Sequence, residues 1–309
     1  MKYLRQAKLW SLIGVLVLFS TSMSAQAAGT LAGATISNTA TIDYSVGGVG
    51  QTGIESAPAG NSTPGVGNGT STDFIVDNKV IVTVAEITDS AAAVTPGQAI
   101  PAAASGLTVN ALSFTVTNGG NEHQDYVLTA ANLAAAQQAP FTVPVTDDSD
   151  VTTPFELYLD VNSDNQYTEG TDTILPTSAG NYYLDEMAPD EVRRVLVVAA
   201  IPGTLVDGNV SVVSLVATTY DGNGAAALGA LTTNDDGTAD NPAAVDVVFA
   251  DAAGTDDTTG ARDGEHSDRD AFTVASAQIS IQKTAATIWW NPAGTGNATV
   301  ANPKAIPGA

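Results

Sequence analysis

Hydrophobic and polar residues alternate along most of the chain with a period of two, which is the pattern of β-strands. In residues 112–117 the side chains are Leu, Phe and Val at even positions and Ser or Thr at odd ones. Residues 195–198 are apolar throughout, which is typical of a central strand with both faces covered. Val212 and Val213 are adjacent within a strand-like segment and predict a bulge there. Helical periodicity is nearly absent, and only residues 130–138 could hold a short helical turn.

Seven strand-like segments predict one large β-domain at residues 79–250. They are residues 80–86, 107–117, 124–130, 155–159, 193–201, 210–220 and 244–250. Turn signals such as the Asn-Gly-Gly-Asn run at 118–121 separate them. This arrangement predicts an all-β fold whose antiparallel sheets pack as an immunoglobulin-like β-sandwich.

A smaller β segment is predicted before this domain, at residues 28–78. Its apolar positions on one period-2 face are Ile36, Ile42, Tyr44 and Val46. Gly47-Gly48 predicts a hairpin turn, and a loop rich in Gly, Pro, Ser and Asn follows. The segment amounts to about half a sandwich. We therefore expect it either to pack on the main domain or to pair with a neighbouring molecule.

After the main domain, residues 251–271 predict an acidic, glycine-rich loop. Strand-like sequence then returns from Phe272 to Ile288, and a tail rich in Pro, Gly and Asn completes the chain. We interpret residues 272–309 as a separate segment that begins a further β unit.

The first 27 residues have the three regions of a signal peptide. Lys2, Arg5 and Lys8 form a positive region, residues 12–19 are apolar, and Ala25-Gln26-Ala27 is a small-x-small cleavage site. The apolar run is too short to span a bilayer, and no later segment could do so. The sequence therefore predicts export to the periplasm, the cell surface or the extracellular space, with no transmembrane segment after cleavage.

Charge and cysteine content narrow the partners. Cleavage removes three basic residues and no acid, so the net charge changes from −23 to −26. Such a surface repels nucleic acid and anionic lipid and attracts cations. A hydrophobic fraction of 44% favours folding over disorder. Because the chain has no cysteine, it is stabilised without disulfides, and a bound metal is one candidate for that support.

Several passages resemble DUF11-type (conserved repeat) proteins of bacterial envelopes. Residues 112–128, LSFTVTNGGNEHQDYVL, resemble their strand-turn-strand signature, and residues 184–202, LDEMAPDEVRRVLVVAAIP, resemble their L-x-P-G-E segment, with Asp190 in place of glycine. Residues 279–309 are similar to the opening of another repeat. The resemblance implies secreted immunoglobulin-like sandwiches. It also implies an incomplete final repeat, which belongs either to a truncated product or to a tail that pairs with another chain.

The most chemically specific stretch is FELYLDVNSDNQYTEGTD, residues 155–172, which predicts a Ca²⁺ loop. Calcium prefers oxygen ligands, and a tight loop turns alternate side chains inward together. The predicted ligands are the side chains of Asp160, Asn162, Asp164 and Asp172, with the backbone carbonyl of Gln166.

This loop departs from an EF-hand. Asn165 replaces the glycine of position six, and Thr171 replaces the glutamate of position twelve, so Asp172 would close a loop one residue longer. Similar loops in DUF11-type and other extracellular sandwiches are taken to bind calcium. The alternative is a solvated turn, because Asp and Asn favour turns on their own.

The acidic loop at 251–271 is a weaker metal candidate. Its oxygen donors would be Asp256, Asp257, Asp263, Glu265, Asp268 and Asp270. Arg262 and Arg269 could compensate these charges instead, and a simply solvated loop is the favoured interpretation.

No catalytic arrangement stands out. The two histidines, His123 and His266, lack cysteine partners for a typical zinc site, and no GxSxG nucleophile motif is present. The GxGxxG match at 48–53 has no helix pattern after it. Trp289-Trp290 could stack on sugars or cover a core edge. We therefore expect a non-catalytic structural or assembly protein that self-associates or binds other envelope proteins; the alternatives are an adhesin or carbohydrate-binding module and, at lower weight, an extracellular hydrolase.

Overall fold

The computed structural model describes residues 29–100, 108–222, 224, 226–235, 241–256 and 260–276. These residues form strands, turns and loops and no helix, so the predicted all-β class is confirmed. Nor does this part of the chain contain a helix long and apolar enough to cross a membrane. The predicted signal peptide lies outside the described residues.

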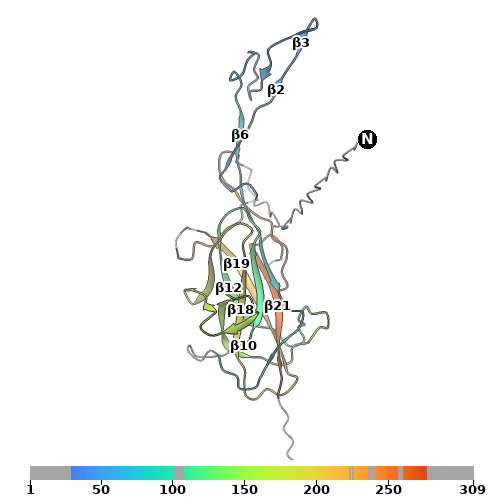
Figure 1. Cartoon of the computed structure of the whole chain (residues 1–309), viewed down its shortest axis with the longest axis vertical. Coiled ribbons are helices and arrows are strands. Elements are labelled where there is room, and N and C mark those ends of the chain that lie inside the picture. Colours follow the sequence, from blue (N-terminus) through green and yellow to red (C-terminus); the bar gives the residue numbers. More distant parts are fainter. Residues whose placement is uncertain are drawn as a thin grey trace, which may run out of the picture.

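Two sheets form the body of the molecule (Figure 1). The five-stranded sheet has the order β15 (Thr173–Ile174), β13 (Thr152–Leu159), β18 (Val192–Ala200), β11 (Leu112–Asn118) and β8 (Val82–Glu86). The six-stranded sheet has the order β16 (Thr177–Ser178), β17 (Asn181–Met187), β12 (Gln124–Asn132), β19 (Val210–Asp221), β21 (Glu265–Val274) and β9 (Ala92–Val94). Neighbouring strands are antiparallel, except that β9 runs parallel to β21. The seven predicted strand segments therefore correspond to observed strands. The strands β9, β14 (Gln166–Thr168), β15, β16 and β17 were not predicted, and of β21 only the last residues, from Phe272, were predicted.

The core lies between the two sheets, and the period-2 alternation places it there. Leu112, Phe114 and Val116 of β11 are fully buried and face Tyr126, Leu215 and other apolar side chains of the opposite sheet. Full burial of one such side chain contributes roughly 1.5–3 kcal/mol. The sandwich is thus held together by the residues that the alternation marks as inward-facing.

Smaller apolar clusters cover the outer faces of both sheets. Leu196 and Val198 of β18 point outward and are buried against Tyr158 and Tyr167, beside the pair of β10 (Thr108–Asn110) and β14 (Gln166–Thr168). This covering explains why residues 195–198 are apolar on both faces.

On the other sheet, Val212 is buried against Ala139 and Phe141 of the 133–150 connection. Val213 faces the main core, and β19 pairs in continuous register with both neighbours, so the predicted bulge is absent. Two adjacent valines are accommodated because both faces are covered. The helical turn expected at 130–138 is also absent, since β12 continues through Asn132.

The end of the sandwich differs from the expected boundaries. β21 begins at Glu265, inside the stretch expected to be loop, and pairs with β19 over nine residues. The sandwich therefore includes residues through Val274. The short strand β20 (Val247–Phe249) pairs in parallel with β7 (Asn78–Val80) beside it.

Residues 29–77, which we call the arm, project from one end of the sandwich (Figure 1). The arm is a long irregular hairpin built from β1 (Thr35–Asn38), β2 (Thr41–Ile42), β3 (Ser45–Val46), β4 (Val49–Gly50), β5 (Ile54–Glu55) and β6 (Thr72–Ile75). Gly47 and Gly48 form its turn with φ of 58° and 83°, so the predicted hairpin turn is confirmed. No residue of the arm is buried. The expectation that this segment packs on the main domain is therefore wrong, because only its base contacts the sandwich.

Candidate metal centre

The predicted calcium loop connects β13 to β14 and β15. β13 ends at Leu159, the chain turns through residues 160–165, and β15 pairs back onto β13. Asp160 and Asp172 stand at the two ends of this excursion and are only 5% and 8% exposed. The loop thus contains two buried aspartates, one at each end.

Asp160 organises the first half of the loop. Its carboxylate accepts the backbone N–H groups of Asp164 (3.3 Å) and Asn165 (3.1 Å). The chain can wrap this tightly because Ser163 and Asn165 adopt left-handed backbone with φ of 59° and 62°. Asparagine tolerates that conformation, so its replacement of glycine at position six costs little.

Asp172 closes the second half. Its carboxylate accepts the backbone N–H groups of Val161 (3.1 Å) and Thr168 (2.7 Å). The pKa of Asp172 is raised, first by burial and also by the negative charges of Asp160 and Asp164, while the two hydrogen bonds lower it. Three carboxylates therefore interact electrostatically across the loop.

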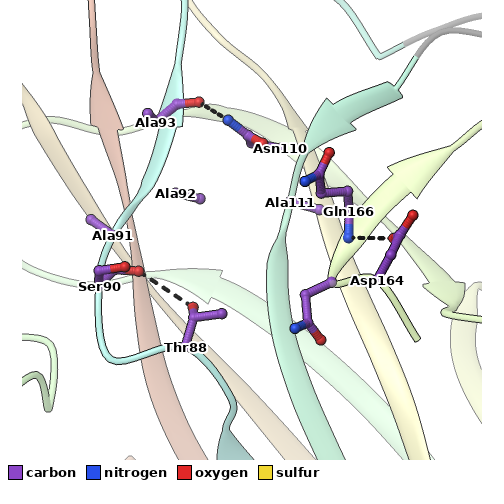
Figure 2. Close-up of a pocket in the computed structure, with 10 residues that line it drawn as sticks. Thr88, Ser90, Ala91, Ala92, Ala93, Asn110, Ala111, Asp164 and Gln166 are labelled. Carbon is purple, nitrogen blue, oxygen red and sulfur yellow. Dashed lines mark hydrogen bonds between the residues drawn. The ribbon is translucent and has the colours of Figure 1, made fainter.

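The other two predicted ligands are arranged differently. Asn162 donates from Nδ2 to Oδ2 of Asp164 at 2.8 Å, and the N–H of Gln166 donates to Oδ1 of Asp164 at 2.9 Å. Gln166 belongs to β14, and its side chain lies with Asp164 and Asn110 at the wall of a pocket of about 310 Å³ (Figure 2). The three aspartates therefore influence one another's charge within the loop, and Asp164 also holds Asn162 and the backbone of Gln166. The predicted ligand at Gln166 was its backbone carbonyl, whereas its side chain lies at the pocket.

These residues carry carboxylate and amide oxygens, which are the donor types that a calcium site uses. Among the described residues, no three His, Asp or Glu side chains lie close enough together to form a group that could hold a metal ion. Each carboxylate oxygen has about two lone-pair sites, so one backbone N–H at an oxygen leaves a position for a metal. Calcium takes about 6–8 oxygen ligands and accepts carboxylates, amide carbonyls and water. Burial is the main cause of the raised pKa of Asp172, and a bound cation would relieve the smaller repulsion from Asp160 and Asp164.

Sequence reasoning missed the residue that fixes this loop to the sheet. Arg194 of β18 donates from Nη1 to Oδ1 of Asn165 at 2.7 Å, and the hydroxyl of Ser113 donates to the carbonyl of Asn165 at 3.2 Å. The available signal was the pair Arg193-Arg194 at the start of an otherwise apolar strand, because a half-buried arginine needs polar partners.

The second acidic loop is organised around Asp251, which was not among the predicted ligands. Its carboxylate accepts the backbone N–H groups of Arg262, Asp263 and Gly264 at 3.0–3.2 Å. Burial raises the pKa of Asp251 despite these bonds. The carboxylate thus closes the loop by hydrogen bonding to its backbone.

The six predicted donors of that loop have separate roles. Asp256 forms an ion pair with Arg269, at 2.7 Å from Nε, so the compensation expected of Arg269 is confirmed. Asp268 and Asp270 lie on β21 and accept backbone N–H groups of the other sheet. Glu265 accepts the hydroxyl of Thr218, the carboxylate of Asp263 accepts the N–H of Glu265, and Asp257 lies outside the described residues. The five described donors thus have separate partners and do not form a metal-binding group.

The two histidines lie apart. His123 is exposed beside Glu122, whereas Nδ1 of His266, on β21, accepts the backbone N–H of Val84 at 3.1 Å. The GxGxxG match lies on the arm and includes its hairpin turn. Trp289-Trp290 falls outside the described residues.

Comparison with known proteins adds little. No family model and no curated protein matches the chain. A solved structure titled "AvmM Catalyzes Macrocyclization in Alchivemycin A Biosynthesis" aligns over 68% of this chain and 95% of that one, with 10% identity and a TM-score of 0.24. A likeness this weak carries no argument, and the DUF11 resemblance stays a prediction.

Proposed function

We propose that this chain is an exported, non-catalytic structural or assembly protein of a bacterial surface, built on a β-sandwich of the immunoglobulin-like type that DUF11 proteins contain. The observation that carries the proposal is that the buried aspartates accept hydrogen bonds from backbone N–H groups. Asp125, Asp147, Asp160, Asp172, Asp251 and Asp270 each direct a carboxylate to backbone N–H groups of a loop or strand.

Such bonds stabilise the fold and give the buried carboxylates a structural role. Asp125 illustrates this, since its two oxygens accept the N–H groups of Glu186 (2.7 Å) on β17 and of Gly229 (2.8 Å) in the loop after β19. A buried donor left without a partner costs about 1–3 kcal/mol, so each of these carboxylates holds a loop in place. They replace the cross-links that a secreted chain without cysteine lacks.

We propose further that the 160–172 loop binds calcium. Asp160, Asp164 and Asp172 would supply carboxylate oxygens and Asn162 its amide oxygen. Bound calcium would join the end of β13 to the start of β15 and neutralise the three acids. Its contribution is structural, because a ligand that binds only the folded state stabilises it by mass action.

Thermal unfolding with and without calcium tests this proposal. The mature chain should melt at a higher temperature in excess Ca²⁺ than in chelator, and Asp172→Asn should abolish most of the difference. Asp150→Asn is the matched control, because Asp150 is an exposed acid outside the loop. Equal melting temperatures of the unmodified chain in calcium and in chelator would contradict the proposal that the loop binds calcium. Export is tested separately, by locating the chain in cell fractions with and without residues 1–27.

A further inference from the structure

The arm exposes apolar side chains that nothing in the described structure covers. Of the fifteen large hydrophobic residues that are exposed in the described part of the chain, eight lie on it: Leu31, Ile36, Ile42, Tyr44, Val46, Val49, Val66 and Phe74. Several form cross-strand pairs, namely Ile36 with Phe74, Ile42 with Ile54, and Val46 with Val49. Directly opposite residues share a face of the hairpin. A two-stranded hairpin without a covered face is marginally stable in water, so a partner would supply what the arm lacks.

The arm is also the least charged part of a strongly acidic molecule. Of the 33 acids, 29 lie in residues 78–276. Between Asp43 and Asp73 the only charged side chain is Glu55, and its carboxylate accepts the N–H groups of Gly67 (2.7 Å) and Gly69 (3.1 Å). A second acidic molecule can therefore approach the arm with less repulsion than it would meet at the sandwich.

Residues 277–309 of this chain have the complementary composition. They contain no acid and two lysines, Lys283 and Lys304. Their sequence alternates from the start, with Ile279 and Ile281 separated by serine, which is the pattern of a strand with one apolar face. Such a segment can add to the open edge of a hairpin through main-chain hydrogen bonds and bury its apolar face there.

The sheet topology shows whether residues 277–309 can reach the arm of the same molecule or only that of a second copy. β19 lies between β12 and β21, and its Asp221 pairs with Gln124 near the turn where Asn121 holds Thr30 of the arm. Thr273 of β21 pairs with Val210, at the other end of β19. β21 thus runs away from the arm (Figure 1).

A distance estimate excludes the chain's own segment. Ile281 is seven residues beyond Val274 and can lie at most about 25 Å from it. The ten residues of β21 alone span about 33 Å, and the arm projects beyond the far end of the sandwich. Ile279 and Ile281 therefore cannot reach the arm of their own molecule, whereas those of a second copy can.

We infer that the segment around Ile279–Ile281 of one copy docks, as an added strand, on the exposed apolar side chains of the arm of the next. This inference rests on the proposed assembly function and names its partner. Because donor and acceptor lie at opposite ends of the sandwich, the contact is head-to-tail. Repetition of such a contact builds an open chain of molecules unless the rotation between them closes a ring.

Analytical ultracentrifugation of the mature chain tests the contact. The unmodified chain should form concentration-dependent oligomers up to about 100 μM, a range that detects micromolar dissociation constants. Ile279→Asp/Ile281→Asp and Val46→Asp/Val49→Asp should each be monomeric. Val46 and Val49 are 63% and 65% exposed, so their replacement should leave the fold intact. The control is Val143→Asp, a change at a 78% exposed valine of the sandwich, which should oligomerise like the unmodified chain.

Mixing the two double variants makes the test specific. One variant keeps an intact arm and the other an intact tail, so an equimolar mixture should form heterodimers and nothing larger. Dimers of the tail variant alone would instead show arm-to-arm pairing and overturn the inference. A monomeric unmodified chain would overturn it as well, while a calcium-dependent melting temperature of that monomer would leave the proposed calcium site standing.

Discussion

Asp268 on β21 accepts the backbone N–H of Glu86 on β8 through Oδ2, at 2.8 Å. β8 is the edge of the five-stranded sheet, and β21 belongs to the other sheet. His266 accepts the N–H of Val84 in the same way, and Asp270 that of Ser113. Alternate side chains of β21 thus cap the donors of a neighbouring sheet, which closes an edge that could otherwise pair with another chain.

This contact predicts an unusual dependence of stability on pH. The pKa of Glu86 is raised from 4.5 to about 7, mainly by burial and also by the charges of Asp268 and Asp89, while hydrogen bonds from Thr88 lower it. Asp270, which senses both Glu86 and Asp268, has a pKa well above its ordinary value, chiefly because it is buried. A raised folded-state pKa gives stability that is complete below the unfolded value and is lost as the pH rises through the folded one.

We therefore expect the free energy of unfolding to fall as the pH rises from about 4.5 to about 7. Urea unfolding at intervals across this window measures the slope. Glu86→Gln should flatten it, whereas Glu122→Gln, at a more exposed glutamate, should not. A slope that is unchanged by Glu86→Gln would assign the effect to other acids.

Because the outer face of the five-stranded sheet is also covered, we expect two leucines on its opposite faces to contribute similarly to the free energy of unfolding. Leu196 points away from the main core and Leu157 into it, yet both are at most 1% exposed. Leu196→Ala and Leu157→Ala should each lower the unfolding free energy by about 2–5 kcal/mol. Leu231→Ala, at a leucine that is 54% exposed, should change it by less than about 0.5 kcal/mol. If Leu196→Ala behaves like the surface control, the outer cluster contributes no stability.

Asn165 predicts an order among substitutions in the calcium loop. Its φ of 62° suits asparagine and glycine, and its side chain accepts from Arg194. Asn165→Gly loses only the hydrogen bond, at about 1 kcal/mol. Asn165→Ala adds the cost of left-handed backbone, for a total of about 2–3 kcal/mol. Chemical unfolding in chelator compares them, and a glycine variant less stable than the alanine variant would contradict this account.

The arm predicts that a large deletion is tolerated. The N–H of Gly33 donates to the carbonyl of Val76 at 2.8 Å, so the two strands are adjacent where they leave the sandwich. Replacing residues 35–74 with a two-residue turn removes no buried side chain. The monomer should keep its unfolding free energy within about 0.5 kcal/mol. A loss of several kcal/mol in calorimetry would show that the arm supports the sandwich.

The sequence alone determined the all-β class, most strands of the sandwich, the hairpin turn at Gly47-Gly48 and the acids of the 160–172 loop. These are local properties, because alternation, turn residues and ligand spacing are all expressed within about ten residues. The exposure of the arm, by contrast, cannot be inferred from its local sequence. Its alternation resembles that of the buried strands, and only the absence of a second layer over it leaves Ile42 and Val46 exposed.

Tertiary structure also decided what the acids do. Asp251 and Asp270 have no distinctive neighbours in the sequence, and they became structural because folding brought backbone donors to them. Glu86 acquires its raised pKa from burial and from β21, which lies about 180 residues away along the chain. Composition could therefore predict an acidic molecule, whereas the environment of each carboxylate depends on which strands the two sheets bring together.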